Sequence, residues 1–237
     1  MSDESTYKSS LETLAYSAVP FDLFREVHKG LRFAIFRAIE RAGSVDHANE
    51  VERGDFVSMV DATVVLLREH HRHEDDFVRP LLLSLDEPLA RQVDSGHEEI
   101  NEYLEQIEVR AAELAGSNGD DAVRRGLELY LLLTRFAALY ITHLLLEEGD
   151  VMARLRGLVS LRQLFELEMA IRTGISPETM CDFIAVMAPA MNPDERSNML
   201  VGMRDGAPPE IYEQFRAATA ASLDPSEYAA VAARIAR

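Results

Sequence analysis

Apolar residues recur at alternating steps of four and three residues along a segment that begins near Asp55. The positions in phase are Phe56, Val60, Thr63, Leu67, His70, Glu74, Phe77 and Leu81. This alternation is typical of an α-helix that turns one face toward a hydrophobic core. Because His70 and Glu74 fall on that face, the predicted core contains an imidazole and a carboxylate.

Three further segments show the same periodicity. They lie at about residues 21–41, between the sequences LDEP and GSNGD, and at about residues 121–155. Ala, Leu, Glu and Arg dominate the composition and favour helices, whereas β-branched runs are scarce. Four helices of similar length with short connections predict an all-α fold, an up-down-up-down four-helix bundle.

The pattern changes to shorter helices after about Arg156. The sequences SPET, NPDE and DPSE each place Ser, Asn or Asp before a proline, which is a typical helix start, and APPE offers another near Pro208. This part of the chain contains no histidine. We therefore divide the chain into a bundle, residues 1–157, and a C-terminal extension of short helices, residues 158–237.

Charge and cysteine content exclude several classes of function. The net charge of −17 among 237 residues argues against binding to nucleic acid or to anionic membranes. A single cysteine, Cys181, excludes a disulfide framework or a cysteine-based metal cluster and fits a reducing, cytoplasmic setting. No secretory signal and no uncharged membrane span is visible. The expected partners are cations, small neutral molecules and other proteins, the last through the C-terminal helices.

Each predicted bundle helix carries one histidine on its apolar face, namely His28, His70, His97 and His143. Two of them are followed four residues later by a glutamate, Glu74 and Glu147. Residues four apart stack on the same face of a helix, so an imidazole and a carboxylate can hold the same cation. Each half of the bundle thus supplies one lone histidine and one His-x-x-x-Glu pair, a pseudo-twofold arrangement that suits two metal ions bridged by both glutamates.

The alternative is that these histidines are hydrogen-bonded core residues, which is the common role of a single buried histidine. Four of them on four helices, together with two glutamates, would cost several kcal/mol for each unpaired charge without a cation. Imidazole and carboxylate donors without thiolate suit iron, manganese or zinc. The ferritin-like plan needs two Glu-x-x-His motifs, and the nearest sequence here is a single DSGH, so that plan does not fit.

These segments resemble the hemerythrin family in its HHE cation-binding form. The resemblance covers about residues 15–157 and rests on FREVHKGLR, HHRHEDDFVRPLL, DSGHEEI and THLLLEEGDVMARL. It implies a four-helix bundle around a non-haem di-iron centre with an oxo or hydroxo bridge. The ligands that it implies are His28, His70, Glu74, His97, His143 and Glu147.

Two departures from the oxygen-carrying members bear on function. Asn101 stands where those proteins have a second histidine on the third helix, and Glu147 follows the last histidine by four residues instead of five. One imidazole fewer would leave a coordination position open. We therefore predict a non-haem di-iron protein that binds or turns over dioxygen, hydrogen peroxide or nitric oxide.

Three alternatives use the same site. The first is an iron or oxygen sensor, or an interaction module, whose state the C-terminal helices pass to a partner. The second is a di-iron oxidase or oxygenase whose organic substrate binds in a pocket shaped by those helices. The third is iron delivery or repair of iron–sulfur centres, for which the segment around Cys181 is thin support.

Other polar residues near the motifs are weaker candidates. His73, Asn101 and Tyr140 are candidates for contacts with the ligands, although His73 is better explained by an edge or solvated position. His71 with Asp75 offers an alternative frame for the motif, but a position about 100° from His70 leaves the apolar face. His47 is predicted to be polar surface in a loop.

Overall fold

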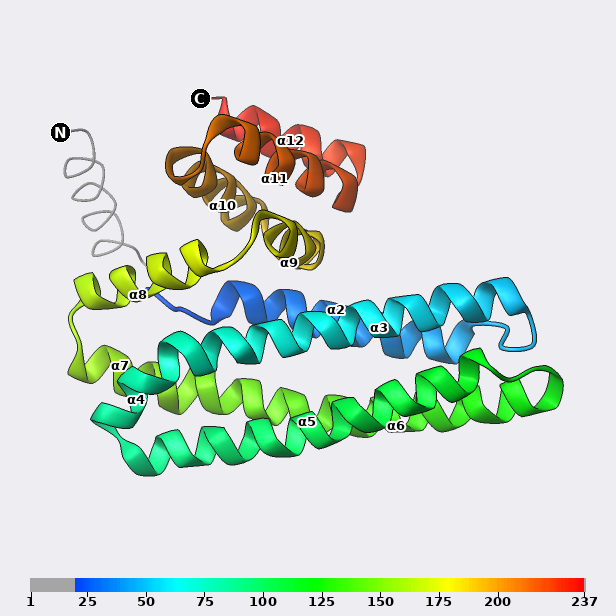
Figure 1. The fold of residues 1–237 in the computed structure, drawn as a ribbon. Helices are drawn as coiled ribbons and strands as arrows, with labels where there is room; N and C mark the ends of the chain where they lie inside the picture. The colour runs from blue at the N-terminus through cyan, green and yellow to red at the C-terminus, as the bar shows by residue number, and fades with distance from the viewer. Residues whose placement is uncertain (1–19, 237) are drawn as a thin grey trace.

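The computed structural model describes residues 20–236, and all of the regular structure in that range is helical. Four long helices lie side by side (Figure 1). They are α2 (Arg25–Ser44), α3 (Glu50–His73), α5 (Glu87–Ala115) and α6 (Gly119–Leu146). Consecutive long helices contact each other, and α6 contacts α2, so the four close into a ring. The predicted four-helix bundle is confirmed.

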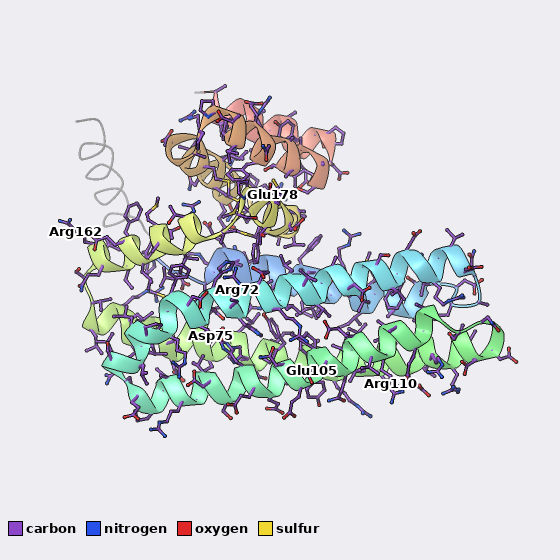
Figure 2. The ribbon with its side chains drawn as sticks, viewed as in Figure 1. Arg72, Asp75, Glu105, Arg110, Arg162 and Glu178 are labelled. Atoms are coloured by element: carbon purple, nitrogen blue, oxygen red, sulfur yellow. The ribbon has the colours of Figure 1, made fainter. Side chains whose placement is uncertain are left out.

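The bundle encloses a hydrophobic core in which the predicted apolar faces meet. Its largest fully buried side chains include Phe56, Phe136 and Tyr140. Charged residues such as Glu105 and Arg110 of α5 lie on the outer face of that helix (Figure 2). This division of apolar and charged residues explains why a single helical periodicity runs through each segment.

Two of the long helices continue through a π-helical turn, which the sequence periodicity does not show. Helix α3 passes through η1 (Glu74–Val78) into α4 (Arg79–Leu85), and α6 passes through η2 (Glu147–Val151) into α7 (Met152–Leu158). Each π turn begins at one of the two glutamates of the predicted site. Such turns are rare and occur frequently at functional sites.

Five shorter helices make up the C-terminal extension. They are α8 (Leu161–Gly174), α9 (Pro177–Ala190), α10 (Pro193–Gly206), α11 (Pro209–Ser222) and α12 (Pro225–Ile235). The side chains of Ser176 and Asn192 cap α9 and α10, and each of the last four helices begins at a proline. The helix starts predicted from the Pro-containing sequences are therefore confirmed.

The extension packs against the side of the bundle formed by α2 (Figure 1). Helix α9 approaches α2 so closely that a Cβ atom on Gly30 would lie 2.8 Å from Cγ of Met187. Lys29 of the bundle also pairs with Glu195 of α10, with 2.6 Å between Nζ and Oε1. The extension has a methionine-rich hydrophobic core of its own.

One helical stretch, Gly119–Leu158, is long and apolar enough to cross a membrane by length and composition alone. The central helix of a globular bundle passes the same test, because it is apolar on the face that it buries. Here that face supplies Leu129, Phe136 and Tyr140 to the bundle core.

Candidate metal centre

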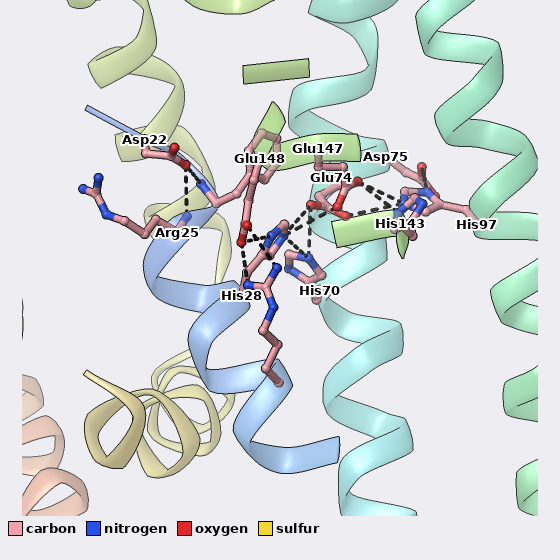
Figure 3. Close-up of polar contacts among 12 residues, drawn as sticks. Asp22, Arg25, His28, His70, Glu74, Asp75, His97, His143, Glu147 and Glu148 are labelled. Atoms are coloured by element: carbon pink, nitrogen blue, oxygen red, sulfur yellow. Dashed lines mark hydrogen bonds and ion pairs between the residues drawn. The ribbon is translucent and has the colours of Figure 1, made fainter. Parts of the chain in front are cut away.

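The six residues that the sequence singles out meet inside one end of the bundle (Figure 3). Each long helix contributes one histidine, and the two π turns contribute the glutamates. All six side chains are buried, and no residue of the set is more than 6% exposed. The set is His28, His70, Glu74, His97, His143 and Glu147. Residues far apart in the sequence thus share one polar pocket within an apolar core.

One half of this centre is formed by His28 and His70 with one oxygen from each glutamate. Nε2 of His70 lies 3.1 Å from Oε1 of Glu74. Nε2 of His28 lies 3.6 Å from the same oxygen and 3.6 Å from Oε2 of Glu147. These ligand atoms lie within 4.8 Å of one another, close enough to hold one cation.

The other half uses the remaining oxygen of each glutamate. Nε2 of His143 lies 3.1 Å from Oε1 of Glu147, and Nε2 of His97 lies 3.4 Å from Oε2 of Glu74. Each carboxylate therefore points one oxygen into each half. This is the geometry expected of two carboxylates that bridge a pair of metal ions.

Two further carboxylates orient the lone histidines from behind. Nδ1 of His28 lies 3.1 Å from Oε1 of Glu148, which Arg32 holds with two hydrogen bonds. Nδ1 of His97 lies 3.1 Å from Oδ1 of Asp75. A proton on Nδ1 donated to these oxygens leaves Nε2 free to face the centre. The arrangement is crossed: Glu148, which supports His28, comes from the helix that supplies His143, and Asp75, which supports His97, comes from the helix that supplies His70.

The charges of the centre are mutually dependent. Burial opposes a charge on His28, but its hydrogen bond to Glu148 and the nearby carboxylate of Glu74 raise its pKa to about 9. Burial likewise opposes a charge on His97, but its hydrogen bond to Asp75 and the nearby carboxylates of Glu147 and Glu74 raise its pKa to about 12. Burial alone would raise the pKa values of Glu74 and Glu147, yet the surrounding imidazoles lower both. In the metal-free protein, protons on the imidazoles therefore supply the positive charge that balances the two carboxylates. A bound cation would supply that charge instead.

Several nitrogen and oxygen atoms that point into the centre lack a hydrogen-bond partner within residues 20–236. They include both carboxylate oxygens of Glu74, Oε2 of Glu147, and Nε2 of His97 and of His143. The short contacts among them therefore lack hydrogen-bond geometry. An unsatisfied buried polar atom costs about 1–3 kcal/mol, and a buried charge costs more. A buried set of converging imidazoles and carboxylates with unused lone pairs fits metal binding.

His71 also lies in the centre, contrary to the prediction that it leaves the buried face. It is 3% exposed, and its ring stacks on that of His97 with centroids 4.5 Å apart. Neither of its ring nitrogens has a hydrogen-bond partner in the described part of the chain. Burial and then the charge of His97 hold the pKa of His71 well below its usual value, so its imidazole is neutral. One of its nitrogens lies within 4.8 Å of ligand atoms of Glu74, His97 and His143.

Residues 19–155 match the family model described as Hemerythrin HHE cation binding domain. The chain belongs to the hemerythrin family. No curated protein and no solved structure gives a significant match to the chain. Membership and the buried His/Glu clusters together make this hemerythrin domain a metal-binding one.

The weaker candidates Tyr140, Asn101 and His73 lie in three different settings. Tyr140 is fully buried 5.5 Å from the ring of His71, and its hydroxyl lacks a partner among the described residues. Burial raises the pKa of Tyr140 well above its usual value, so this neutral hydroxyl can donate a hydrogen bond toward the centre. Asn101 instead accepts a hydrogen bond from Arg68 of α3.

His73 and His47 are both buried, so the predictions of a solvated position for His73 and of polar surface for His47 were wrong. His73 lies beside Phe183 of the C-terminal extension, with ring centroids 6.3 Å apart, because α9 covers this face of the hemerythrin bundle. His47 packs against Gly126 of α6, where a Cβ atom would overlap its ring, and its Nε2 lies 3.1 Å from the carbonyl oxygen of Ala42. The isolated glycine within a helical pattern was the available signal of such a close approach.

Proposed function

We propose that this hemerythrin domain binds two iron ions and that a small oxidant, namely dioxygen, hydrogen peroxide or nitric oxide, binds at one of them. The observation that carries the proposal is the position of Glu74 and Glu147, whose carboxylates each point one oxygen into each half of the centre. Two carboxylates that each direct one oxygen to either side can bind two cations at once, whereas a single cation does not require this arrangement.

The donor set favours iron over softer metals. Imidazole and carboxylate groups without thiolate suit iron, manganese and zinc. Iron in such a site can change oxidation state and activate small oxidants, which zinc cannot. Iron also agrees with the expectation drawn from the family resemblance.

The two halves of the centre offer unequal sets of ligands. His71, His97 and His143 serve one half, whereas only His28 and His70 serve the other, and both halves share the two glutamates. His71 from α3 thus supplies the third imidazole that the oxygen-carrying members take from the position of Asn101. We therefore place the open coordination position, and with it the oxidant, in the half of His28 and His70.

The surrounding residues exclude water and fix the ligands. Phe24 stacks on His28 with ring centroids 5.2 Å apart, and Val78 and Val151 are buried in the same apolar cluster. Asp75 and Glu148 hold the lone imidazoles from behind. Small uncharged oxidants can enter such an apolar shell more easily than hydrated ions can.

The test is the metal content of aerobically purified protein, measured by plasma mass spectrometry with an optical spectrum of the same sample. About two irons per chain with near-ultraviolet absorption from a bridged ferric pair would support the proposal. Zinc, or no metal in a stable bundle, would refute the redox function. The matched variants are Glu74→Ala, expected to lose the bridged pair, and His47→Leu, a buried histidine outside the centre, expected to retain it.

Peroxide and nitric oxide are then distinguished on the iron-loaded protein. Stopped-flow spectra with hydrogen peroxide on the ferric form, and with nitric oxide on the ferrous form, report which oxidant changes the centre. Catalytic loss of peroxide would define an enzyme, whereas saturable binding of nitric oxide without turnover would define a binding protein.

A further inference from the structure

A cavity of about 120 Å³ lies between the bundle and the C-terminal extension. Its walls come from α2, α3 and η1 on one side and from α8, α9 and α10 on the other. In Figure 1 these helices of the extension lie along the side of the bundle that carries α2 and α3. An apolar cavity of about 150 Å³ in another protein binds benzene, so this volume suits a small organic molecule.

The cavity reaches the half of the centre with fewer imidazoles. His70 of that half and Glu74, which both halves share, form part of its wall, and so does the buried His73. His71 and His143 of the other half do not line it. A molecule in the cavity would therefore lie beside the position that we assign to the oxidant.

The wall opposite the centre is rich in polarizable side chains. Four methionines of the extension line the cavity together with Phe183 of α9, and Phe24 lines it from the bundle side. The methionines are Met180, Met187, Met199 and Met203. Thioethers make favourable contacts with aromatic rings and adapt to irregular shapes, so such a wall favours a flat aromatic ligand.

The charged groups in the wall determine which ligands are excluded. Glu26 of α2 and Glu168 of α8 line the cavity with one arginine, Arg172, whose Nη1 lies 3.6 Å from Oε1 of Glu168. Two carboxyl groups against one guanidinium disfavour an anion and favour a neutral or cationic ligand.

We propose that this cavity binds a small aromatic molecule, neutral or positively charged, against the His28 and His70 half of the metal centre. The cavity itself does not depend on the proposed function, but the position of its ligand next to a metal ion does. The extension would thus give the centre an organic ligand as well as a small oxidant.

The proposal is tested with phenol, benzylamine and benzoate as neutral, cationic and anionic probes of similar size. Each is titrated into the full-length chain, metal-free and zinc-loaded, while the methyl resonances of ¹³C-labelled methionines and the heat of binding are recorded. Phenol and benzylamine should shift the resonances of the four cavity methionines. The affinity for benzoate should be lower by roughly tenfold or more, because the carboxyl groups of Glu26 and Glu168 disfavour an anion.

Two variants locate the probe and test the charge selectivity. Ile171→Trp fills the cavity from α8 and should abolish binding, whereas Thr173→Trp, at an exposed position of the same helix, should not. Glu168→Lys leaves the apolar wall intact and should reverse the preference between benzylamine and benzoate. This variant changes a partly exposed side chain, so it tests the proposal even if the tryptophan variant does not fold.

The outcomes separate this proposal from that of the iron centre. Absence of binding by the wild-type chain, binding that persists in folded Ile171→Trp, or a preference unchanged in Glu168→Lys would overturn the cavity proposal. None of these results affects the iron content of the purified protein. Conversely, binding of phenol and benzylamine by a chain that purifies without iron would support the cavity and refute the proposed function.

Discussion

The substitution His71→Leu tests whether His71 is a metal ligand or an ordinary histidine of the core. In the metal-free protein the imidazole of His71 is neutral and buried, and neither ring nitrogen has a partner among residues 20–236. Leucine is similar in volume and has no polar atom to satisfy. The substitution should therefore stabilise the metal-free protein and weaken the metal-loaded one.

The size of both effects follows from the structure. Removing one unsatisfied buried imidazole should recover about 1–3 kcal/mol. At about 3 °C per kcal/mol for a chain of this size, the metal-free melting temperature should rise by roughly 3–9 °C. Loss of a ligand should weaken metal binding by at least the 10- to 100-fold typical of a supporting group. Each tenfold loss removes about 1.4 kcal/mol of metal-dependent stabilisation.

The assay is thermal unfolding of the wild type and of His71→Leu, each with and without one fixed concentration of iron or zinc. His47→Leu is the matched control, because His47 is buried in the same bundle but packs against Ala42 and Gly126 outside the centre. It should leave the metal-dependent shift unchanged. A lower metal-free melting temperature in His71→Leu, or an undiminished metal-dependent shift, would refute a ligand role for His71.

Three other predictions concern the support of the centre. Asp75→Asn should weaken metal binding by roughly 10- to 100-fold, measured by competition with a chromophoric chelator; an unchanged affinity would contradict the orienting role. Gly96→Ala would place a Cβ atom 2.5 Å from Nδ1 of His143 and should lower metal content, whereas Gly54→Ala, with no atom within 4 Å, should not. Because the raised pKa of His28, about 9, keeps a proton on the metal-free imidazole, metal binding should release protons and weaken as the pH falls from 8 to 6. An affinity independent of pH over that range would contradict this protonation state.

The fold and the six converging residues could be predicted because both depend on one periodicity. A helix that packs in a bundle must bury residues at steps of three and four, so His28, His70, His97 and His143 had to face the same core. The glutamates four residues after His70 and His143 follow by the same rule. Helix starts in the extension could be predicted because capping residues and N-terminal prolines act locally.

His71 could not be placed by that rule, because a bundle helix has two flanks that both face the interior. The ring of His70 meets His28 of α2, with centroids 5.0 Å apart, whereas the ring of His71 stacks on His97 of α5. The two directions differ by about 100° around the helix, as expected for consecutive residues. A single apolar stripe predicts only one of them.

His73 escaped prediction for a different reason, which is that its neighbours come from outside the bundle. It is buried by α9, and nothing in the local sequence around residue 73 specifies where α9 packs. Contacts of this kind depend on tertiary packing between distant segments. The sequence therefore predicts the metal centre better than the cavity beside it.

The unequal halves of the centre trace to one position of the pseudo-twofold repeat. His70 and His143 are equivalent, as are Glu74 and Glu147, but the residue after His70 is a histidine and the residue after His143 is Leu144. Leu144 is fully buried in the bundle core, so the repeat has no second equivalent of His71. A third imidazole is therefore available to only one half. The cavity borders the other half, so the proposed open coordination position and the proposed site for an organic ligand lie on the same side of the centre.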